Sequence, residues 1–262
     1  MRGRGTAPFE PNQRCSDRHR GRAYADPVTG GPDDVGASRD PSRPGAVERP
    51  AYDDEATPDP SDEGVGVGPY PFPWPDDPRL DPHLLEHGDA RNVVDAYRYW
   101  TVEAIVADLD TRRHPFHVAI ENLAHDFNIG SVVRTANAFN AASVRVVGRR
   151  RWNRRGAMVT DRYLHVEHHD DARSLAAWAA GAGLVLVGVD NLPGSVPLET
   201  YDLPRACVLL FGQEGTGLSE PARLACDVTV SIAQYGSTRS INVGAAAAIA
   251  MHAWIRQHAA SP

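Results

Sequence analysis

The sequence predicts an α/β fold built on a parallel sheet, and three observations lead to this prediction. From residue 116 onward, short apolar segments alternate with longer segments of helical character, which is the order of βαβ units. The apolar segments consist mainly of β-branched and aliphatic residues, as in buried strands. Polar or glycine-rich loops follow three of them, and such loops form the ligand crevice of an open parallel sheet.

Residues 1–68 differ in composition from the rest of the chain. Fifteen of the 21 Pro lie in residues 1–82, and residues 1–68 carry 9 Arg against 13 Asp and Glu with hardly an apolar cluster. We expect this segment to be a disordered tail. The net charge of the whole chain is −7, so overall charge does not point to nucleic acid as a partner.

All 27 basic residues are Arg, whose planar guanidinium suits phosphate, although a codon bias explains the same count and is the favoured reading. Cys15, Cys207 and Cys226 are an odd number without metal-ligand spacing, which indicates structural thiols in a reducing cytoplasm. The longest apolar stretch is too short to cross a bilayer. We therefore expect a cytoplasmic protein without a membrane partner.

Residues 69–114 form the next part, here called the extension. Residues 70–75 alternate aromatic residues with Pro and predict a strap laid across the domain. Apolar positions spaced by three and four from Val94 to Leu109 predict a helix that begins at Asp89 and ends near Arg112. A globular domain over residues 115–258 is expected to follow.

The first βαβ unit of this domain comprises a strand at 118–121, a polar loop at 122–128, a helix at 129–139 and a strand at 144–147. The amino end of the helix faces the loop and offers free N–H groups to an anion. Arg134 lies within the first two turns of this helix. It is either a site residue near the loop or a surface arginine paired with an acid.

An arginine-rich stretch comes next. Between residues 145 and 162 there are seven Arg and one Asp, a local net charge of +6. Positive charge around an aromatic side chain favours RNA or another polyanion over a merely solvated loop. The candidate RNA-binding residues form the basic segment, residues 149–155: Arg149, Arg150, Arg151, Trp152, Arg154 and Arg155. The polar run 165–171 suggests a metal site, but it lacks a second ligand cluster, and we predict no metal.

The alternation continues with a helix around 174–180, a strand at 184–189 and a buried strand at 206–212. A loop with Gly212, Gly215 and Gly217 follows, in which the backbone turns tightly and approaches a ligand, and Ser219 caps the next helix. The spacing matches neither a dinucleotide fingerprint nor a phosphate loop.

The last unit joins a strand at 228–232 to a helix that opens at Asn242 and is rich in Gly and Ala. Gly236 allows a turn between them, and Ser237, Thr238 or Ser240 is expected to cap the helix. The first turns of the helix carry so little side-chain bulk that another helix, a ligand or a second subunit must approach its backbone closely.

Three stretches together resemble the SpoU-type RNA 2'-O-ribose methyltransferases of the SPOUT superfamily. They are N-I-G-S-V-V-R-T at 128–135, F-G-Q-E-G-T-G-L at 211–218 and I-A-Q-Y-G-S-T-R-S-I-N-V at 232–243. Their order and separations also match, and the resemblance covers roughly residues 116–256. One departure is clear: Ala233 and Gln234 stand where the family usually has Pro-Met.

This resemblance implies a deep trefoil knot at the C-terminal end of the α/β domain, bound S-adenosylmethionine and a homodimer. It implies that backbone groups of Gly212, Ile232 and Ile241 hold the cofactor, with Leu210 and Gly236 beside them. Arg134 is then the catalytic residue, and the site is shaped by the remaining matched side chains: Asn128, Glu214, Ser240 and Asn242.

The resemblance leaves two classes of function open. The favoured one is a methyltransferase that acts on tRNA or rRNA, since the matched polar residues are all present. The alternative is a non-catalytic RNA-binding module that keeps the cofactor fold, and an enzyme for a small molecule is a distant third. No ribosomal-protein-like RNA-binding domain is evident before the α/β domain, which leans slightly towards tRNA and assigns RNA capture to the basic segment and the dimer surface.

Overall fold

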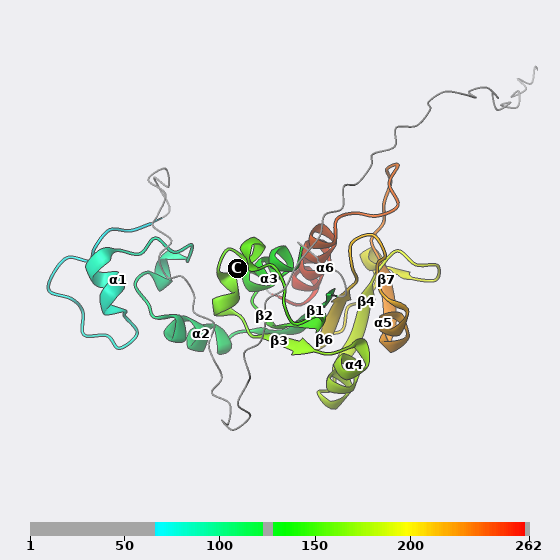
Figure 1. Ribbon diagram of the computed structural model, residues 1–262, viewed down its shortest axis with the longest axis horizontal. Coiled ribbons are helices and arrows are strands. Elements are labelled where there is room, and N and C mark those ends of the chain that lie inside the picture. Colours follow the sequence, from blue (N-terminus) through cyan, green and yellow to red (C-terminus); the bar gives the residue numbers. More distant parts are fainter. Residues whose placement is uncertain (1–65, 123–127, 260–262) are drawn as a thin grey trace, which may run out of the picture. The chain divides into compact units, whose positions relative to one another are not determined.

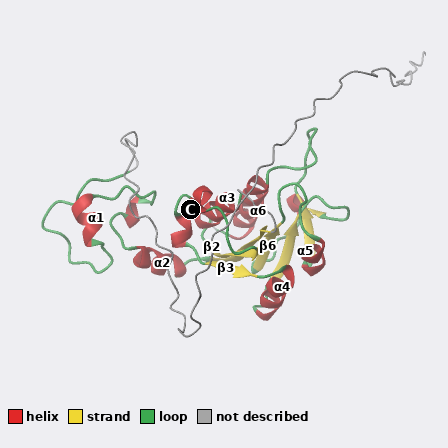
Figure 2. Cartoon of the chain, viewed as in Figure 1, coloured by secondary structure: helices red, strands yellow, loops and turns green. Residues whose placement is uncertain are grey.

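The computed structural model describes residues 66–122 and 128–259, which belong to one compact unit. Nearly all of the predicted tail lies outside these residues. Within them, seven strands form one sheet in the order β3-β2-β1-β6-β4-β7-β5, and every neighbouring pair is parallel. The sheet lies between helices (Figures 1 and 2), so the predicted parallel α/β fold is confirmed.

The described residues contain the following elements. The strands are β1 (His114–Asn122), β2 (Ala141–Gly148), β3 (Val166–His169), β4 (Val185–Val189), β5 (Val196–Pro197), β6 (Cys207–Phe211) and β7 (Val228–Ser231). The α-helices are α1 (Pro82–His87), α2 (Val102–Asp110), α3 (Ile129–Ala138), α4 (Ala172–Gly181), α5 (Glu220–Ala225) and α6 (Val243–His258). Short 3-10 helices are η1 (Asp95–Tyr97), η2 (Arg154–Ala157), η3 (Thr160–Tyr163) and η4 (Leu198–Thr200).

The sheet is buried on both faces because its strands are apolar at successive positions. Leu209 and Phe211 of β6 pack on the face covered by α3 and α6, and Val208 and Leu210 pack on the face covered by α4 and α5. All of β6 is buried. The loops that leave the carboxyl ends of β4, β6 and β7 therefore start from a rigid base.

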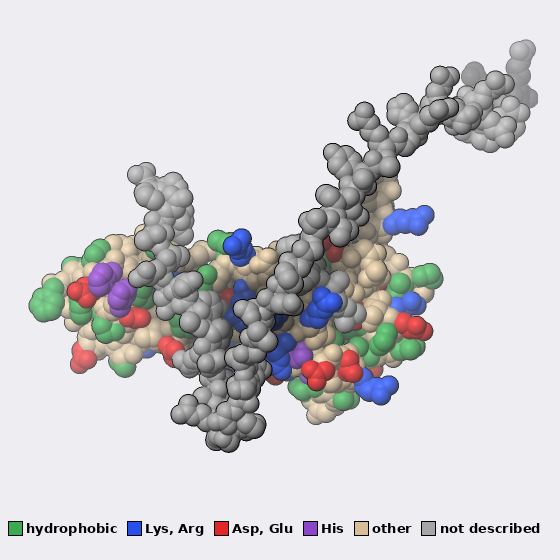
Figure 3. All heavy atoms as spheres, in the orientation of Figure 1, with side chains coloured by type: hydrophobic (Ala, Val, Ile, Leu, Met, Phe, Trp, Pro, Cys, Tyr) green, Lys and Arg blue, Asp and Glu red, His purple; other side chains and the backbone are tan. Residues whose placement is uncertain are grey.

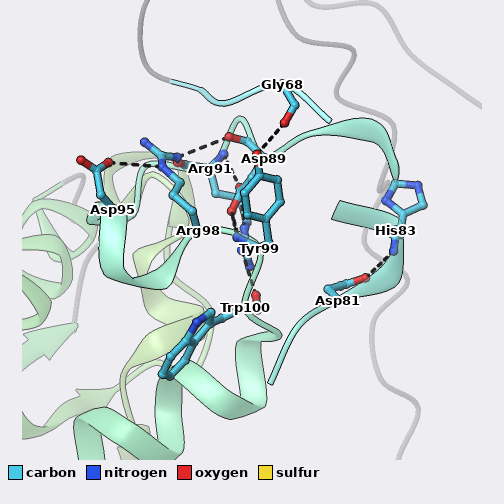
Figure 4. Close-up of polar contacts among 9 residues, drawn as sticks. All are labelled: Gly68, Asp81, His83, Asp89, Arg91, Asp95, Arg98, Tyr99 and Trp100. Carbon is cyan, nitrogen blue, oxygen red and sulfur yellow. Dashed lines mark hydrogen bonds and ion pairs between the residues drawn. The ribbon is translucent and has the colours of Figure 1, made fainter. Parts of the chain in front are cut away.

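The extension differs from its prediction. The expected helix from Asp89 does not form: the chain has the short η1 and becomes α-helical only at Val102, with Thr101 as the N-cap. Tyr99 has a φ of 62°, which an α-helix excludes. Local hydrogen bonds to the Asp89 carboxylate take the place of helical ones, because they stabilise a turn at residues 89–99 (Figure 4).

The extension packs on the α/β domain through α2. Ile105 of α2, Tyr97 and Tyr163 of η3 form a small hydrophobic cluster. Arg113 donates to the carbonyl of Tyr163 at 2.9 Å, and His165 lies 2.9 Å from the carboxylate of Asp110. The extension is thereby tied to the chain that follows the basic segment.

The surface of the extension is partly apolar. Hydrophobic side chains lie over the segment that carries α1 (Figure 3), and Phe72 is 87% exposed. No helix within residues 66–122 and 128–259 combines the length and the apolar character needed to cross a bilayer.

Candidate active site

A cavity of about 440 Å³ opens at the carboxyl ends of β4, β6 and β7. Its walls are the residues after β4, the loop after β6, the segment after β7 and the first turn of α6. Open parallel sheets bind their ligands at this edge. The cavity also falls within the usual size range of small-molecule sites, which is about 300–1,000 Å³.

Residues 212–218, here called the glycine loop, form one wall of the cavity and close on themselves. The N–H of Gln213 donates to the carbonyl of Gly217, and the N–H of Gly217 donates back to Gln213, each at 3.0 Å. A Cβ on Gly212 would lie 2.0 Å from the carbonyl carbon of Gly217, so only glycine fits there. The tight turn expected of this loop is confirmed, and the approach of its backbone to a ligand stays a prediction.

Three of the predicted site residues meet beside this cavity in a hydrogen-bonded group, here called the site network. The amide Nδ2 of Asn128 donates to Oε2 of Glu214 at 2.8 Å. The amide Nδ2 of Asn242 donates to Oδ1 of Asn128 at 3.0 Å and to Oε1 of Glu214 at 3.1 Å. Each residue comes from a different one of the three sequence stretches, so the network joins the amino ends of α3 and α6 to the glycine loop.

Asn242 also caps the amino end of α6. Its Oδ1 accepts from the N–H of Gly244 at 2.9 Å and from that of Ala245 at 3.3 Å, which makes Asn242 the N-cap. The cap predicted at Ser237, Thr238 or Ser240 is therefore wrong, because the helix begins only at Val243. The small first turn of α6 lets α3 come near: a Cβ on Gly244 would lie 3.5 Å from the Cβ of Ser131.

Arg134 and Ser240 are placed differently. Arg134 is exposed on α3, and among the described residues it pairs with no acid. It is not one of the residues that line the cavity, whereas Ser240 and its neighbour Arg239 are. The Arg134 guanidinium is thus free to meet a ligand that reaches over α3.

A family model matches residues 115–252, just over half of the chain, and its description is the SpoU rRNA Methylase family. The chain belongs to this family. The match begins at β1 and ends within α6, so it contains the whole site network and the cavity walls.

Two of the curated proteins that resemble this chain come from mycobacteria. A protein of Mycobacterium sp. (strain KMS), described as an uncharacterized tRNA/rRNA methyltransferase, is 34% identical over 147 residues, which are 53% of this chain and 46% of the relative. A protein of Mycobacterium bovis with the same description is 30% identical over 186 residues, 68% of this chain and 56% of the relative. The chain spans about half the length of the curated relatives it matches.

Solved SpoU structures share the fold. The methyltransferase AviRb from Streptomyces viridochromogenes, in complex with AdoMet, is 29% identical with a TM-score of 0.51, covering 59% of this chain and 62% of that one. The TrmH/SpoU tRNA modifying enzyme of A. aeolicus has a TM-score of 0.54 at 22% identity, covering 60% and 81%, and shows the fold alone.

Of the five residues that the SpoU resemblance assigns to the cofactor, three line the cavity and two lie elsewhere. Gly212, Ile232 and Ile241 line the cavity. Leu210 is fully buried in the cluster on the α4 and α5 face of the sheet, and Gly236 lies in the exposed turn outside the cavity wall. The role of Leu210 and Gly236 stays a prediction.

Gln234 is one of the two residues at which this chain departs from the SpoU pattern, and it lines the cavity. Its Oε1 is buried and accepts no hydrogen bond from the described residues. A buried acceptor without a donor costs about 1–3 kcal/mol. An N–H or O–H group of a ligand in the cavity would remove this cost.

Sequence reasoning missed two carboxylates that hold the glycine loop. Asp190, directly after β4, accepts from the N–H of Leu218 at 2.8 Å and lines the cavity. Glu121, near the end of β1, accepts from the N–H and the hydroxyl of Ser219. A signal was available: each is a charged residue directly after a run of apolar residues and glycine, 118–120 before Glu121 and 185–189 before Asp190.

The arginines of the basic segment are exposed, and a residue of β1 holds the backbone of this segment. Asn122 donates from Nδ2 to the carbonyls of Arg149 at 2.6 Å and of Arg151 at 2.9 Å. Trp152 is half-buried against the core, with the guanidinium of Arg154 5.6 Å from its ring centroid. Because part of Trp152 packs against the core, less of its ring is available to stack on a base than the sequence suggested.

The helix η2 at the end of the basic segment packs on α3. A Cβ on Gly130 of α3 would lie 2.6 Å from the backbone nitrogen of Ala157 in η2. Since α3 also carries Arg134, the basic segment and the predicted catalytic arginine lie on neighbouring elements.

The described residues contain neither a cluster of metal ligands nor a reactive thiol. In the part of the chain that the structure describes, no three His, Cys, Asp or Glu side chains are arranged to hold a metal ion. Burial raises the pKa of Cys207 and of Cys226 to about 12, and the charges of Asp227 and Glu121 add to the rise at Cys226. Both thiols stay protonated at neutral pH, which fits the predicted structural role.

Proposed function

We propose that this protein transfers a methyl group from S-adenosylmethionine to a ribose 2'-hydroxyl of tRNA or rRNA. The observation that carries the proposal is the site network, because it joins the three SpoU stretches at one cavity. The family and the tRNA/rRNA methyltransferase relatives support methyl transfer to RNA. The AdoMet complex of AviRb supports the cofactor.

The residues around the cavity fit this cofactor. The carboxylates of Asp190 and Glu214 suit a ligand with a sulfonium and an ammonium group, and Arg239 suits its carboxylate. The unpaired Oε1 of Gln234 can accept from an N–H or O–H of the adenosyl part. When bound, S-adenosylmethionine supplies a methyl group that the positively charged sulfur activates for transfer.

The role we assign to Arg134 follows from the chemistry of its guanidinium. Because a guanidinium keeps its proton at physiological pH, arginine is a poor base and a good anion ligand. We propose that Arg134 binds the phosphate next to the target ribose and stabilises the negative charge that develops on the attacking 2'-oxygen. The proton of the hydroxyl leaves to that phosphate, to water or to a transiently neutral Arg134, and holding both reactants in line supplies much of the rate.

RNA capture is assigned to the basic segment, which lies on an element adjacent to α3. Its exposed arginines neutralise backbone phosphates without reading sequence. With a substrate of this kind, we propose a cytoplasmic location.

We further propose a homodimer that uses α6, with the C-terminal segment threaded into a trefoil knot. A groove of about 590 Å³ runs along α6, with apolar walls from Phe139, Leu198, Ile249 and Ala253 and polar side chains from Glu199, His252, Arg256 and Gln257. Ile249 is 43% exposed although it is apolar. Light scattering coupled to size exclusion tests the dimer, and Ile249→Arg is expected to yield monomers.

The test of the reaction is transfer of labelled methyl groups to purified total tRNA and, separately, to rRNA. The wild type is expected to label one of them as a nuclease-resistant 2'-O-methyl dinucleotide. Arg134→Ala is expected to lose about 100-fold or more of the rate, the usual cost of removing a group that stabilises transition-state charge.

Arg173→Ala is the matched control, because Arg173 is an exposed arginine on α4, on the opposite face of the sheet. It is expected to keep the wild-type rate. Cofactor binding without label on either RNA would favour the non-catalytic RNA-binding module, and label on a base instead of a ribose would refute the 2'-O assignment.

A further inference from the structure

Glu121 is a buried carboxylate that the proposed reaction does not use. Its side chain is 1% exposed near the carboxyl end of β1. Both oxygens accept from one residue: Oε2 from the N–H of Ser219 at 2.8 Å and Oε1 from its hydroxyl at 2.6 Å. Burying a carboxylate costs several kcal/mol before its partners are counted, so a fold that keeps one here must satisfy it well.

Ser219 is the residue that directly follows the glycine loop. It ends the loop and begins α5, because its hydroxyl oxygen accepts from the N–H of Ala222 at 3.2 Å. The loop begins at Gly212, directly after Phe211, and Phe211 pairs with Ile120 of β1. Both ends of the glycine loop are thus fastened to neighbouring residues of one strand.

The loop between these ends has little freedom left. The reciprocal hydrogen bonds of Gln213 and Gly217 close it, and the N–H of Leu218 is held by Asp190. The Asp190 carboxylate also packs closely against Gly217, because a Cβ on this residue would lie 2.3 Å from Oδ2 of Asp190. Asp190 lines the cavity, but Glu121 does not. Any influence of Glu121 on a bound ligand must therefore pass through the loop.

We infer that Glu121 is a positioning residue for the cofactor: by fixing Ser219 it sets the shape of the glycine loop before S-adenosylmethionine binds. A loop that is already ordered loses less conformational entropy on binding, which strengthens affinity. This inference rests on the proposed cofactor. It assigns Glu121 to affinity for the cofactor and not to the chemical step.

The test is the dissociation constant of S-adenosylmethionine, measured by titration calorimetry without RNA. Glu121→Met keeps the length of the side chain and removes both acceptors, and it is expected to weaken binding by about 10-fold or more. Glu121→Gln keeps one acceptor, and Ser219→Ala removes one donor together with the cap of α5; each is expected to weaken binding by about 3-fold. With saturating cofactor, kcat on RNA is expected to stay within about twofold of the wild type.

Asp227→Asn is the matched control. Asp227 accepts from the N–H of Leu186 at 2.7 Å, at the end of β4 opposite to the cavity. The variant changes a carboxylate-to-backbone hydrogen bond of an exposed residue away from the glycine loop, and its dissociation constant is expected to equal that of the wild type.

The outcomes separate the two claims. Glu121 variants with a lower melting temperature and unchanged cofactor affinity would make Glu121 a purely structural residue and overturn the inference. If Glu121→Met does not fold, Glu121→Gln and Ser219→Ala decide in the same way. A wild type that binds the cofactor but methylates no RNA would refute the proposed function and leave the role of Glu121 intact, and a wild type that binds no cofactor would refute both.

Discussion

Two polar networks of this protein are built on opposite principles. In the extension, Asp89 is fully buried and accepts four hydrogen bonds from Arg91 and Tyr99, all within eleven residues of chain (Figure 4). The site network instead links Asn128, Glu214 and Asn242 over 86 and 114 residues, and it stays exposed. The first network is closed and stabilises a turn, and the second faces a cavity where a ligand can complete it.

The largest effect is expected from breaking the buried network with Asp89→Asn. The change leaves the Arg91 guanidinium without its carboxylate, and losing one partner of a buried ion pair costs about 3 kcal/mol or more. Hydrogen exchange should show the extension opening, while the cofactor affinity of the α/β domain stays near that of the wild type.

Asp77→Asn offers a matched control, because Asp77 and Arg79 repeat the same spacing and the same backbone contact on the exposed surface. Its effect on stability is expected to be far smaller. Equal losses in the two variants would contradict the distinction between a closed, buried network and an exposed one.

A substitution in the site network is expected to lower the rate of methyl transfer and to change the stability little. Asn242→Asp keeps the Oδ1 that caps α6, removes the amide that donates to Asn128, and sets a second carboxylate against Glu214. We expect about a 100-fold lower rate of methyl transfer, with the melting temperature nearly unchanged. Asn153→Asp, which also retains its cap on η2, is the control and should keep wild-type cofactor affinity.

Gln234 is a further polar group beside the cavity, and its buried Oε1 has no donor among the described residues. Gln234→Met removes this acceptor and should raise the melting temperature of the ligand-free protein. The same change should weaken cofactor binding by about 5-fold, the worth of one hydrogen bond. Tyr235→Phe, at the 96% exposed neighbour, should do neither, and a Gln234→Met protein that binds as the wild type does would remove Gln234 from the cofactor site.

The smallest effect is expected from mild acid. Burial by itself raises the pKa of Asp89, but the hydrogen bonds from Arg91 and from the N–H of Tyr99 outweigh it and lower the pKa below its usual 3.8. A carboxyl with a lowered pKa stabilises the fold above its unfolded value and loses this contribution only as the pH falls through the folded one. Between pH 7 and 4, exchange protection of the extension should therefore stay constant, and a loss in this window would contradict the assignment.

The order and type of most elements from β1 to α6 could be predicted from the sequence, but β3 and β5 lie in segments for which no strand was predicted. Continuous apolar segments such as 206–212 predict buried strands, and Gly212 and Gly217 predict a tight loop, because burial and backbone freedom depend on local residue type. The same reasoning failed at Asp89, where apolar spacing suggested a helix. Hydrogen bonds from the backbone to one buried carboxylate competed with helix formation and prevailed.

Only the tertiary structure decided which polar groups meet. The resemblance named Asn128, Glu214 and Asn242, yet their contact depends on parallel strands that deliver three distant loops to one edge of the sheet. It also decided that Glu121 and Asp190 hold the glycine loop and that Leu210 faces away from the side on which Leu209 lies. Periodicity records which side of a strand is buried, and it carries no information about which distant residue lies there.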